Sequence, residues 1–153
     1  MNQDFVDLLR AFNEEKVKYL IVGGYALIKY TEPRYTKDLD VWVSTDSENA
    51  EKVFRAPMRY GAPISNMSAA DFSREGFYFT MGLAPNRVDI FFDLAGLQFG
   101  TAWERRVHTS IGDVAANFIS RTDLIINKEA VGRKQDLADV EKLRIAEMRD
   151  NNG

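Results

Sequence analysis

The spacing of apolar residues along the chain predicts alternating helices and strands. Within residues 4–13, apolar side chains recur every three or four positions, as they do on one face of an amphipathic helix. The short apolar run VKYLIV at 17–22 is typical of a buried strand, and it leads into Gly23-Gly24. The same criteria predict helices at 26–30, 47–56, 97–106, 121–131 and 134–149, and strands at 36–43, 77–83, 87–94, 107–111 and 114–119.

The order of these elements favours an α/β (α+β) fold in which a mixed β-sheet is flanked by helices. The strands at 77–83 and 87–94 are separated by the turn residues Pro85 and Asn86, which predicts a hairpin and argues against a doubly wound parallel sheet. Two C-terminal helices close the chain, with Gly132 between them. The sequence contains no repeat, low-complexity segment or linker, so we expect residues 1–153 to form a single domain.

The composition excludes several kinds of site. The chain has no cysteine and one histidine, His108, which rules out disulfides, thiolate ligands, cysteine nucleophiles and clusters of several histidines. No apolar stretch is long enough to span a membrane and the first residues do not resemble a signal peptide, so we expect a cytoplasmic protein. The net charge of −3 and the pI of about 5.2 give no support to nucleic-acid binding through phosphate neutralisation alone.

Polar residues alternate with apolar ones at the start of the strand predicted at 36–43. Arg34, Thr36, Asp38 and Asp40 occupy every second position. In an extended chain such residues share one face, and two carboxylates two positions apart have Cα atoms about 6.5–7 Å apart. Their oxygens can converge on Mg²⁺, which prefers a few carboxylates together with water and phosphate oxygens. The pattern therefore suits a platform for a metal-bound triphosphate, although two solvated acids at a strand edge would produce the same pattern.

Gly23-Gly24 stands where the strand at 17–22 ends and a helix begins. Glycine lets the backbone approach a phosphate closely, and free amides at a helix N-terminus point toward the anion. The spacing matches neither the dinucleotide-binding nor the P-loop pattern, so neither of those sites is indicated. The alternative explanation of the glycine pair is a tight turn.

Asp89 lies between two apolar neighbours in the strand predicted at 87–94. A charge in an apolar strand costs free energy unless it is paired or bound to a metal. Beside the D-x-D of the strand at 36–43, it would complete a cluster of three carboxylates and serve as a metal ligand or as the general base. Asp93 is a rival for this position, and an acid at the edge of a hairpin is the simpler explanation of Asp89.

Together these motifs resemble those of the nucleotidyltransferase superfamily that shares the polymerase-β palm. The glycine pair, R-x-T-x-D-x-D and the later V-D-I occur in that order. The segment LIVGGYALIKYTEPRYTKDLDVWV resembles AbiEii-like and related minimal nucleotidyltransferases, and TDLIINKEAVGRKQDLADVEKL resembles the segment that those proteins carry after the palm. The resemblance covers nearly the whole chain and implies a polymerase-β-like palm that transfers a nucleotidyl group.

The resemblance also implies roles for individual residues. Lys128 would approach the nucleotide phosphates, where its charge helps pyrophosphate to leave, and Asp136, with Arg133, would support that end of the site. Many relatives carry R-x-K-D, whereas this chain has RKQD at 133–136. Arg34 and Thr36 are candidates for contacts with phosphate. The other implied roles are Gly23 and Gly24 as phosphate-side backbone, Asp38 and Asp40 as Mg²⁺ ligands, and Asp89 as the third carboxylate.

Three functional hypotheses follow. The first is a Mg²⁺-dependent enzyme that moves NMP from an NTP to an acceptor hydroxyl, with pyrophosphate leaving. Because AbiEii-like members are toxin components and some modify tRNA, the preferred context is a toxin that acts on tRNA and has a separate antitoxin protein. The second is an antibiotic nucleotidyltransferase of the lincosamide or aminoglycoside type, with a small hydroxylated acceptor. The third is a non-catalytic scaffold that binds nucleotide or a partner. A basic groove beside the aspartates would favour RNA, whereas an acidic or aromatic groove would favour the small molecule.

Overall fold

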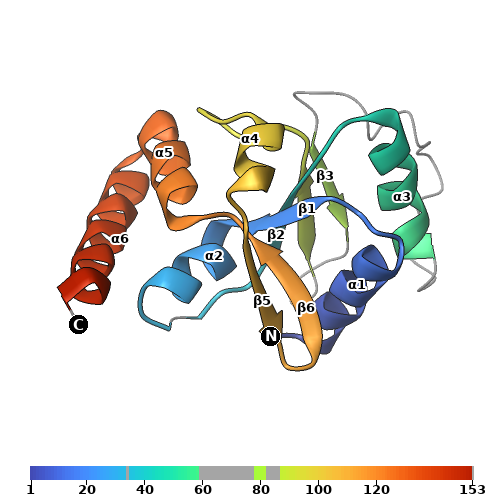
Figure 1. The fold of residues 1–153 in the computed structure, drawn as a ribbon, viewed down its shortest axis with the longest axis horizontal. Coiled ribbons are helices and arrows are strands. Elements are labelled where there is room, and N and C mark those ends of the chain that lie inside the picture. The colour runs from blue at the N-terminus through green and yellow to red at the C-terminus, as the bar shows by residue number, and fades with distance from the viewer. Residues whose placement is uncertain (34, 59–77, 82–86, 153) are drawn as a thin grey trace.

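The computed structural model describes residues 1–33, 35–58, 78–81 and 87–152. These residues form one mixed sheet with helices around it. The strands are β1 (Tyr19–Val22), β2 (Leu39–Val43), β3 (Tyr78–Met81), β4 (Val88–Phe91), β5 (Val107–Ile111) and β6 (Val114–Phe118). The helices are α1 (Gln3–Glu14), α2 (Gly23–Tyr30), α3 (Ser47–Met58), α4 (Phe99–Glu104), α5 (Arg121–Val131) and α6 (Lys134–Asn152). Within the described ranges, the strands follow the order β3-β4-β2-β1-β6-β5 across the sheet (Figure 1).

The middle of the sheet combines parallel and antiparallel pairing. β1 pairs antiparallel with β2 and parallel with β6, and β2 pairs parallel with β4. β3 and β5 form the two edges as antiparallel partners of β4 and β6. This topology confirms the predicted α/β fold with a mixed sheet, including the antiparallel pairing of the two aromatic-rich strands.

Aromatic contacts assign helices to the two faces of the sheet. Phe12 of α1 packs against Tyr19 of β1, with ring centroids 5.5 Å apart. Trp42 of β2 packs edge-on against Phe99 of α4, with centroids 5.1 Å apart. The register of β1 and β2 puts Tyr19 and Trp42 on opposite faces, so α1 and α4 cover opposite faces. Asp40 lies two residues before Trp42 and therefore points to the α4 face.

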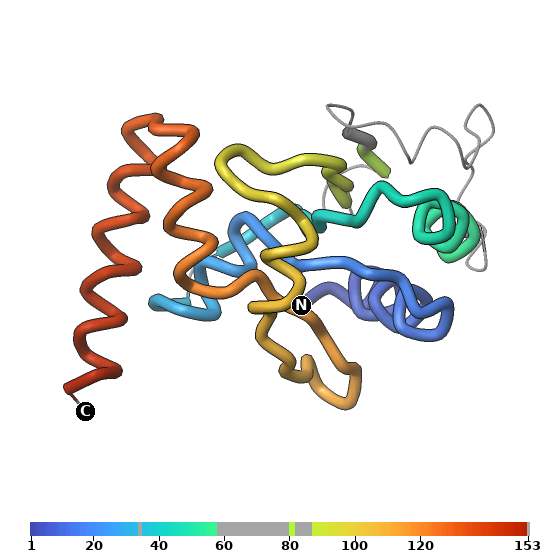
Figure 2. Tube along the Cα trace, turned by 45° about the horizontal axis from the view of Figure 1, so that its top comes forward, coloured from blue at the N-terminus to red at the C-terminus, as the bar shows by residue number. Residues whose placement is uncertain are grey.

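α5 and α6 pack side by side at one end of the molecule, away from α1 and α3 (Figures 1 and 2). Ser120 caps the start of α5, because its side chain accepts a hydrogen bond from the backbone N–H of Asp123 at 3.1 Å. Gly132 ends α5 in the left-handed conformation with φ 71°, which confirms the predicted break between the two helices. In the described part of the chain, no helix has the length and apolar character needed to cross a membrane.

Two elements beside the candidate site, β2 and α2, begin at other residues than predicted. The strand predicted from Thr36 begins at Leu39, and residues 35–38 have no regular structure. The pairing of β2 with β1 stops at Asp40 and Val22, because the chain turns into α2 at Gly23, and Leu39 is paired with Val88 of β4 instead. α2 accordingly starts three residues earlier than predicted.

The far end of β4 also differs from the prediction. The strand ends at Phe91, so Asp93 lies beyond it and is exposed, which removes Asp93 as a rival for the third carboxylate position. α4 is shorter than the helix predicted at 97–106. Pro85 and Asn86, the predicted turn between β3 and β4, lie outside the described residues, as does Arg34.

Candidate active site

The glycine pair packs directly against the D-x-D segment. A Cβ atom on Gly23 would lie 2.1 Å from Oδ2 of Asp40, and one on Gly24 would lie 2.7 Å from Cγ2 of Thr36. Gly23 also has φ +65°, a conformation that side-chain-bearing residues rarely adopt. The first residues of α2 therefore have to be small for the β1–α2 junction to pack against Asp40 and Thr36. The glycine pair thus forms the predicted turn, and the side chains of Asp40 and Thr36 approach its backbone closely.

Asp40 and Asp89 face each other across β2 and β4. The two residues are register partners in the parallel pair, and Val22 of β1 is the partner of Asp40 on its other side. Asp89 is only 8% exposed. Thr80 of β3 donates its hydroxyl to Oδ1 of Asp89 at 2.8 Å, and Arg87 donates its Nε to the same oxygen at 3.1 Å. The buried charge that the sequence pattern flagged is thus compensated by two donors.

Burial, together with neighbouring acids, raises the pKa of Asp40 to about 7. The largest cause is burial, followed by the negative charges of Asp89 and Asp38 and by a hydrogen bond with Asp89, while Arg87 acts in the opposite direction. Near neutral pH the carboxyl of Asp40 is therefore partly protonated, and its proton offsets repulsion from its neighbours. A bound cation would perform the same task and would release that proton.

Asp38 reaches this cluster from the irregular segment before β2. Its Oδ2 lies 3.8 Å from Nε of Arg87, the group that also contacts Asp89. Across the described ranges, no three acidic or histidine side chains are arranged closely enough to enclose one metal ion. The donor chemistry nevertheless fits a hard divalent cation. Asp40 and Asp89 are register partners, Arg87 contacts both Asp38 and Asp89, and burial together with the charges of the other two acids raises the pKa of Asp40.

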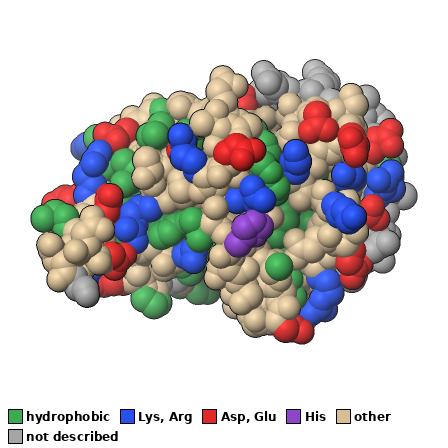
Figure 3. All heavy atoms as spheres, in the orientation of Figure 1, with side chains coloured by type: hydrophobic (Ala, Val, Ile, Leu, Met, Phe, Trp, Pro, Cys, Tyr) green, Lys and Arg blue, Asp and Glu red, His purple; other side chains and the backbone are tan. Residues whose placement is uncertain are grey.

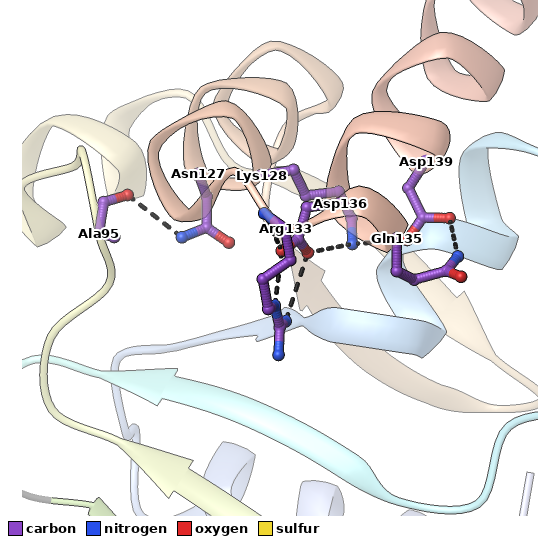
Figure 4. Close-up of polar contacts among 7 residues, drawn as sticks. All are labelled: Ala95, Asn127, Lys128, Arg133, Gln135, Asp136 and Asp139. Atoms are coloured by element: carbon purple, nitrogen blue, oxygen red, sulfur yellow. Dashed lines mark hydrogen bonds and ion pairs between the residues drawn. The ribbon is translucent and has the colours of Figure 1, made fainter.

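Lys128 lies in a second polar cluster at the junction of α5 and α6 (Figure 4). Its Nζ is 3.0 Å from Oδ2 of Asp139 and 3.8 Å from Oδ1 of Asp136, and all three side chains are largely buried. Gln135 donates its side-chain amide to the other oxygen of Asp139 at 2.9 Å. The structure therefore places Lys128 among partners from α6 and brings it into ion pairs with Asp136 and Asp139, which lie three residues apart on that helix.

Asp136 also orders the start of α6. It accepts hydrogen bonds from the backbone N–H of Arg133 at 3.2 Å and from Nε of Arg133 at 2.7 Å. The backbone bond has the form of a capping box, in which the third helical residue reaches back to the residue before the helix. These donors lower the pKa of Asp136 below its usual value. Arg133 is thereby oriented with its guanidinium extending away from both helices (Figure 4).

An aromatic groove opens beside Thr36, on the side of the segment that leads to Asp38. It has a volume of about 390 Å³. Tyr25 donates its hydroxyl to the backbone carbonyl of Thr36 at 3.3 Å, and Tyr35 is 80% exposed. Burial is the main cause that raises the pKa of Tyr25, and the nearby Tyr35 and Asp38 add to it. The side chains that give the groove its character are Phe5, Tyr25, Ile28, Tyr35, Thr36 and Lys37.

The surface charge on the face drawn in Figure 3 is mixed. Lysine and arginine side chains are interspersed there with acidic ones among the described residues. This distribution agrees with the net charge of −3 and differs from the continuous basic surface expected of a protein held to RNA by phosphate contacts alone.

Residues 3–152 match the family described as "nucleotidyltransferase of unknown function" (DUF6036). The chain belongs to this family. The match spans nearly the whole sequence, from α1 to the end of α6, and therefore includes the glycine pair, the three aspartates and the cluster around Lys128. The DUF6036 protein is accordingly a nucleotidyltransferase by family, as the order of its motifs predicted.

Solved structures share the fold of this DUF6036 protein. The crystal structure of the lincosamide antibiotic adenylyltransferase LnuA with lincomycin bound has a TM-score of 0.61 and 17% sequence identity, and the match covers 94% of this chain and 96% of that chain. The crystal structure of a protein described as a "putative nucleotidyltransferase" (TM1012), from Thermotoga maritima, has a TM-score of 0.56 and 16% identity, with 99% and 92% of the two chains covered. At these identities the likeness is one of fold. A comparison with curated proteins finds no match.

Two residues in contact with the predicted site were not identified from the sequence. Arg87 contacts two of the three aspartates, and Asp139 forms the shorter ion pair with Lys128. The sequence held a signal for Asp139, because Asp136, Asp139, Val140 and Leu143 have the spacing of one helix face and are all buried. For Arg87 the only signal was its position two residues before Asp89, which on a strand puts both on one face.

Proposed function

We propose that this protein transfers NMP from an NTP to an acceptor hydroxyl, with release of pyrophosphate, and that residues 1–153 act as one catalytic domain. The observation that carries the proposal is the pairing of Asp40 with Asp89 across β2 and β4, directly against Gly23. A structural role alone does not require two acids to be register partners on one sheet face, since like charges in that position repel. A site that binds a cation does require them.

Asp38, Asp40 and Asp89 would hold the divalent metal, which we take to be Mg²⁺. When bound, the metal supplies Lewis-acid stabilisation of the charge that develops on the transferred phosphoryl group. Asp40 would give up its proton as the metal binds, and Thr80 would keep Asp89 oriented through the hydroxyl hydrogen bond. Asp89 serves in this scheme either as the third ligand or as the base that accepts the proton of the attacking hydroxyl.

The phosphate groups would lie between the two polar clusters. The backbone amides of Gly23 and Gly24, at the start of α2, are suited to a phosphate oxygen. Lys128 and Arg133 would offset the charge of the leaving pyrophosphate, with Asp136 holding both of them. Thr36 is a further candidate for a phosphate contact, because it lies against Gly24. Arg34 is a candidate through its place in the R-x-T-x-D-x-D motif of the sequence.

For the acceptor, we propose first a tRNA end, in the context of a cytoplasmic, AbiEii-like toxin with a cognate antitoxin. This proposal rests on the sequence resemblance of residues 20–43 and 122–143 to AbiEii-like proteins. Arg133 and Lys37 supply positive charge near the two clusters, and their number is small compared with the phosphates of an RNA strand. The acceptor end alone would then enter the site.

A second acceptor class, a small hydroxylated molecule, is supported by the groove beside Thr36. Its aromatic and aliphatic lining suits the apolar face of a compact ligand, while Lys37 and the nearby Asp38 provide polar contacts. LnuA, which shares the fold, carries the description of a lincosamide adenylyltransferase. An enzyme of this class would modify a drug-sized hydroxyl compound.

The decisive experiment measures transfer of label from each α-³²P NTP, with Mg²⁺, into total tRNA and into a panel of hydroxylated antibiotics. The Asp38→Ala, Asp40→Ala double variant is the negative control, and Asp93→Ala, which removes an exposed acid beyond β4, is the matched positive control. Transfer by the wild type and Asp93→Ala alone supports the proposal and names the acceptor. Equal labelling by the double variant would refute it.

A further inference from the structure

Arg87 lies beside the aspartate cluster and provides it with a positive charge. It immediately precedes β4, and its Nε lies 3.1 Å from Oδ1 of Asp89 and 3.8 Å from Oδ2 of Asp38. Its charge also acts on Asp40. One guanidinium therefore contacts two of the acids that the proposed function assigns to the metal, and its charge lowers the pKa of the third.

The contact differs from an ordinary structural ion pair in how easily it can be exchanged. The side chain of Arg87 is 42% exposed, whereas that of Asp89 is 11% exposed. The guanidinium is thus the solvent-accessible partner of the pair, and the carboxylate is the buried one. Asp89 would remain oriented in its absence, because Thr80 donates to the same Oδ1 atom. Asp38, in the irregular segment before β2, is also free of strand constraints.

We propose that Arg87 is a resident counter-cation, which competes with the divalent metal for Asp38 and Asp89 and is displaced when the metal binds. Two cations cannot share these carboxylates without mutual repulsion, so metal entry requires the guanidinium to leave. Once released, the planar guanidinium is available for the phosphate groups of the NTP, which it can bind through two parallel hydrogen bonds.

This arrangement makes metal and nucleotide binding cooperative. The metal alone has to displace Arg87 and binds weakly, whereas the metal with NTP gives the guanidinium a new anionic partner. Linkage requires the effect to be reciprocal, so the nucleotide tightens metal binding by the same factor by which the metal tightens nucleotide binding. The inference rests on the proposed function, since it assumes that the aspartates are the metal ligands.

The test is direct titration of Mn²⁺, followed by electron paramagnetic resonance, with and without a non-hydrolysable NTP analogue. Arg87→Gln should tighten the binding of Mn²⁺ alone by about tenfold, within the usual range of coupling between sites, and should abolish the tightening caused by the analogue. Arg87→Lys, which keeps the charge and loses the planar fork, should retain weak metal binding. Arg55→Gln, which removes a surface pair with Glu15, is the matched control and should behave as the wild type.

A second readout needs no nucleotide. Without metal, Arg87→Gln should lower the melting temperature, because the three acids lose their counter-cation, and added Mn²⁺ should raise it more than in the wild type. Unchanged or weaker Mn²⁺ affinity in Arg87→Gln, with binding still abolished by Asp40→Asn, would overturn the inference and leave the metal site standing. Failure of the wild type to bind Mn²⁺, even with the analogue, would overturn the proposed function as well.

Discussion

Asp40 and Asp89 are register partners in the parallel pair formed by β2 and β4, so two acids distant in sequence meet on one face of the sheet. The same face carries Trp42, whose contact with Phe99 fixes α4 beside the site. The pairing is enforced by the backbone ladder rather than by the acids themselves, which repel each other. The sheet therefore holds the carboxylates together in the absence of any ligand, at a cost that appears in the pKa of Asp40.

That cost predicts an unusual pH dependence of stability. An unfolded chain ionises Asp40 near pH 4, while the folded protein holds its pKa at about 7. Between those values ionisation favours the unfolded state, so metal-free protein should lose stability as the pH rises from 4 to 7, and the loss should then level off. At 1.36 kcal/mol per pKa unit, the rise of about three units corresponds to about 4 kcal/mol in total, of which about 3 kcal/mol falls between pH 4.5 and pH 7.5.

Urea unfolding in EDTA at pH 4.5 and pH 7.5 measures this effect, with Asp40→Asn as the comparison. The free-energy difference between the two pH values should shift by about 3 kcal/mol between wild type and variant. Added Mg²⁺ at pH 7.5 should restore stability to the wild type and not to the variant. Identical pH profiles for the two proteins would contradict the assignment.

Replacement of Gly23 tests the close packing of the β1–α2 junction. Gly23→Ala places a methyl group where Asp40 lies and forces alanine into a left-handed conformation with φ +65°. The backbone alone should cost about 1–2 kcal/mol, and the displaced carboxylate should add to that and reduce metal affinity. Thermal unfolding and Mn²⁺ titration measure the two effects.

Gly100→Ala provides the matched control for Gly23→Ala. Gly100 lies in α4, and an added Cβ there would meet nothing within 4 Å. This variant should be neutral or up to about 1 kcal/mol more stable, as expected for alanine in a helix. If both glycine variants lost the same amount of stability, the packing argument would fail.

Removal of Lys128 should affect stability as well as catalysis. Lys128→Ala leaves Asp139 and Asp136 buried without their ammonium partner, which should cost about 3–5 kcal/mol of unfolding free energy. Adding Asp139→Asn to this variant should recover part of the loss, because it removes one of the stranded charges. A double-mutant cycle by chemical denaturation measures the coupling between the two side chains. Strict additivity would show that the ion pair at 3.0 Å contributes nothing.

Tyr35 distinguishes the two acceptor classes. Its side chain is 80% exposed, so Tyr35→Ala should leave the melting temperature unchanged. If the acceptor is a small molecule in the groove, the variant should raise its KM about tenfold and leave the KM for NTP unchanged, as expected for loss of one stacking contact. Met148→Ala, at another exposed apolar position on α6, is the control that should affect neither constant.

Much of the fold was accessible from sequence because its signals are local. The apolar spacing in α1, the run of apolar residues in β1, and the glycine between α5 and α6 each mark an element without reference to the rest of the chain. The start of β2 was missed because alternation of polar and apolar residues continues before Leu39, whereas its pairing with β1 stops at Asp40. The spacing of apolar residues shows which element a segment can form, whereas pairing with neighbouring strands determines where a strand begins and ends.

The site was accessible to a lesser degree because its contacts join distant segments. The pattern of polar and apolar residues indicated the three aspartates, and resemblance added Lys128. Neither revealed that Arg87 contacts the cluster or that Asp139 pairs with Lys128. In the sequence alone, nothing distinguishes Arg87, just before a strand, or Asp139, on a helix, from other charged residues. Their importance follows from the register of β2 with β4 and from the packing of α5 against α6.

The position of β1 has a consequence for biosynthesis. Its residue Ile21 pairs with Phe118 of β6. One edge of β1 therefore stays unpaired until β6, which lies in the last third of the chain, has left the ribosome. A nascent chain with β1 and β2 paired carries an unprotected apolar edge during that interval, and such an edge is a site for mispairing with another copy. Slow translation upstream of residue 114 should therefore favour aggregation, and a chaperone that covers β1 should increase the yield of folded protein.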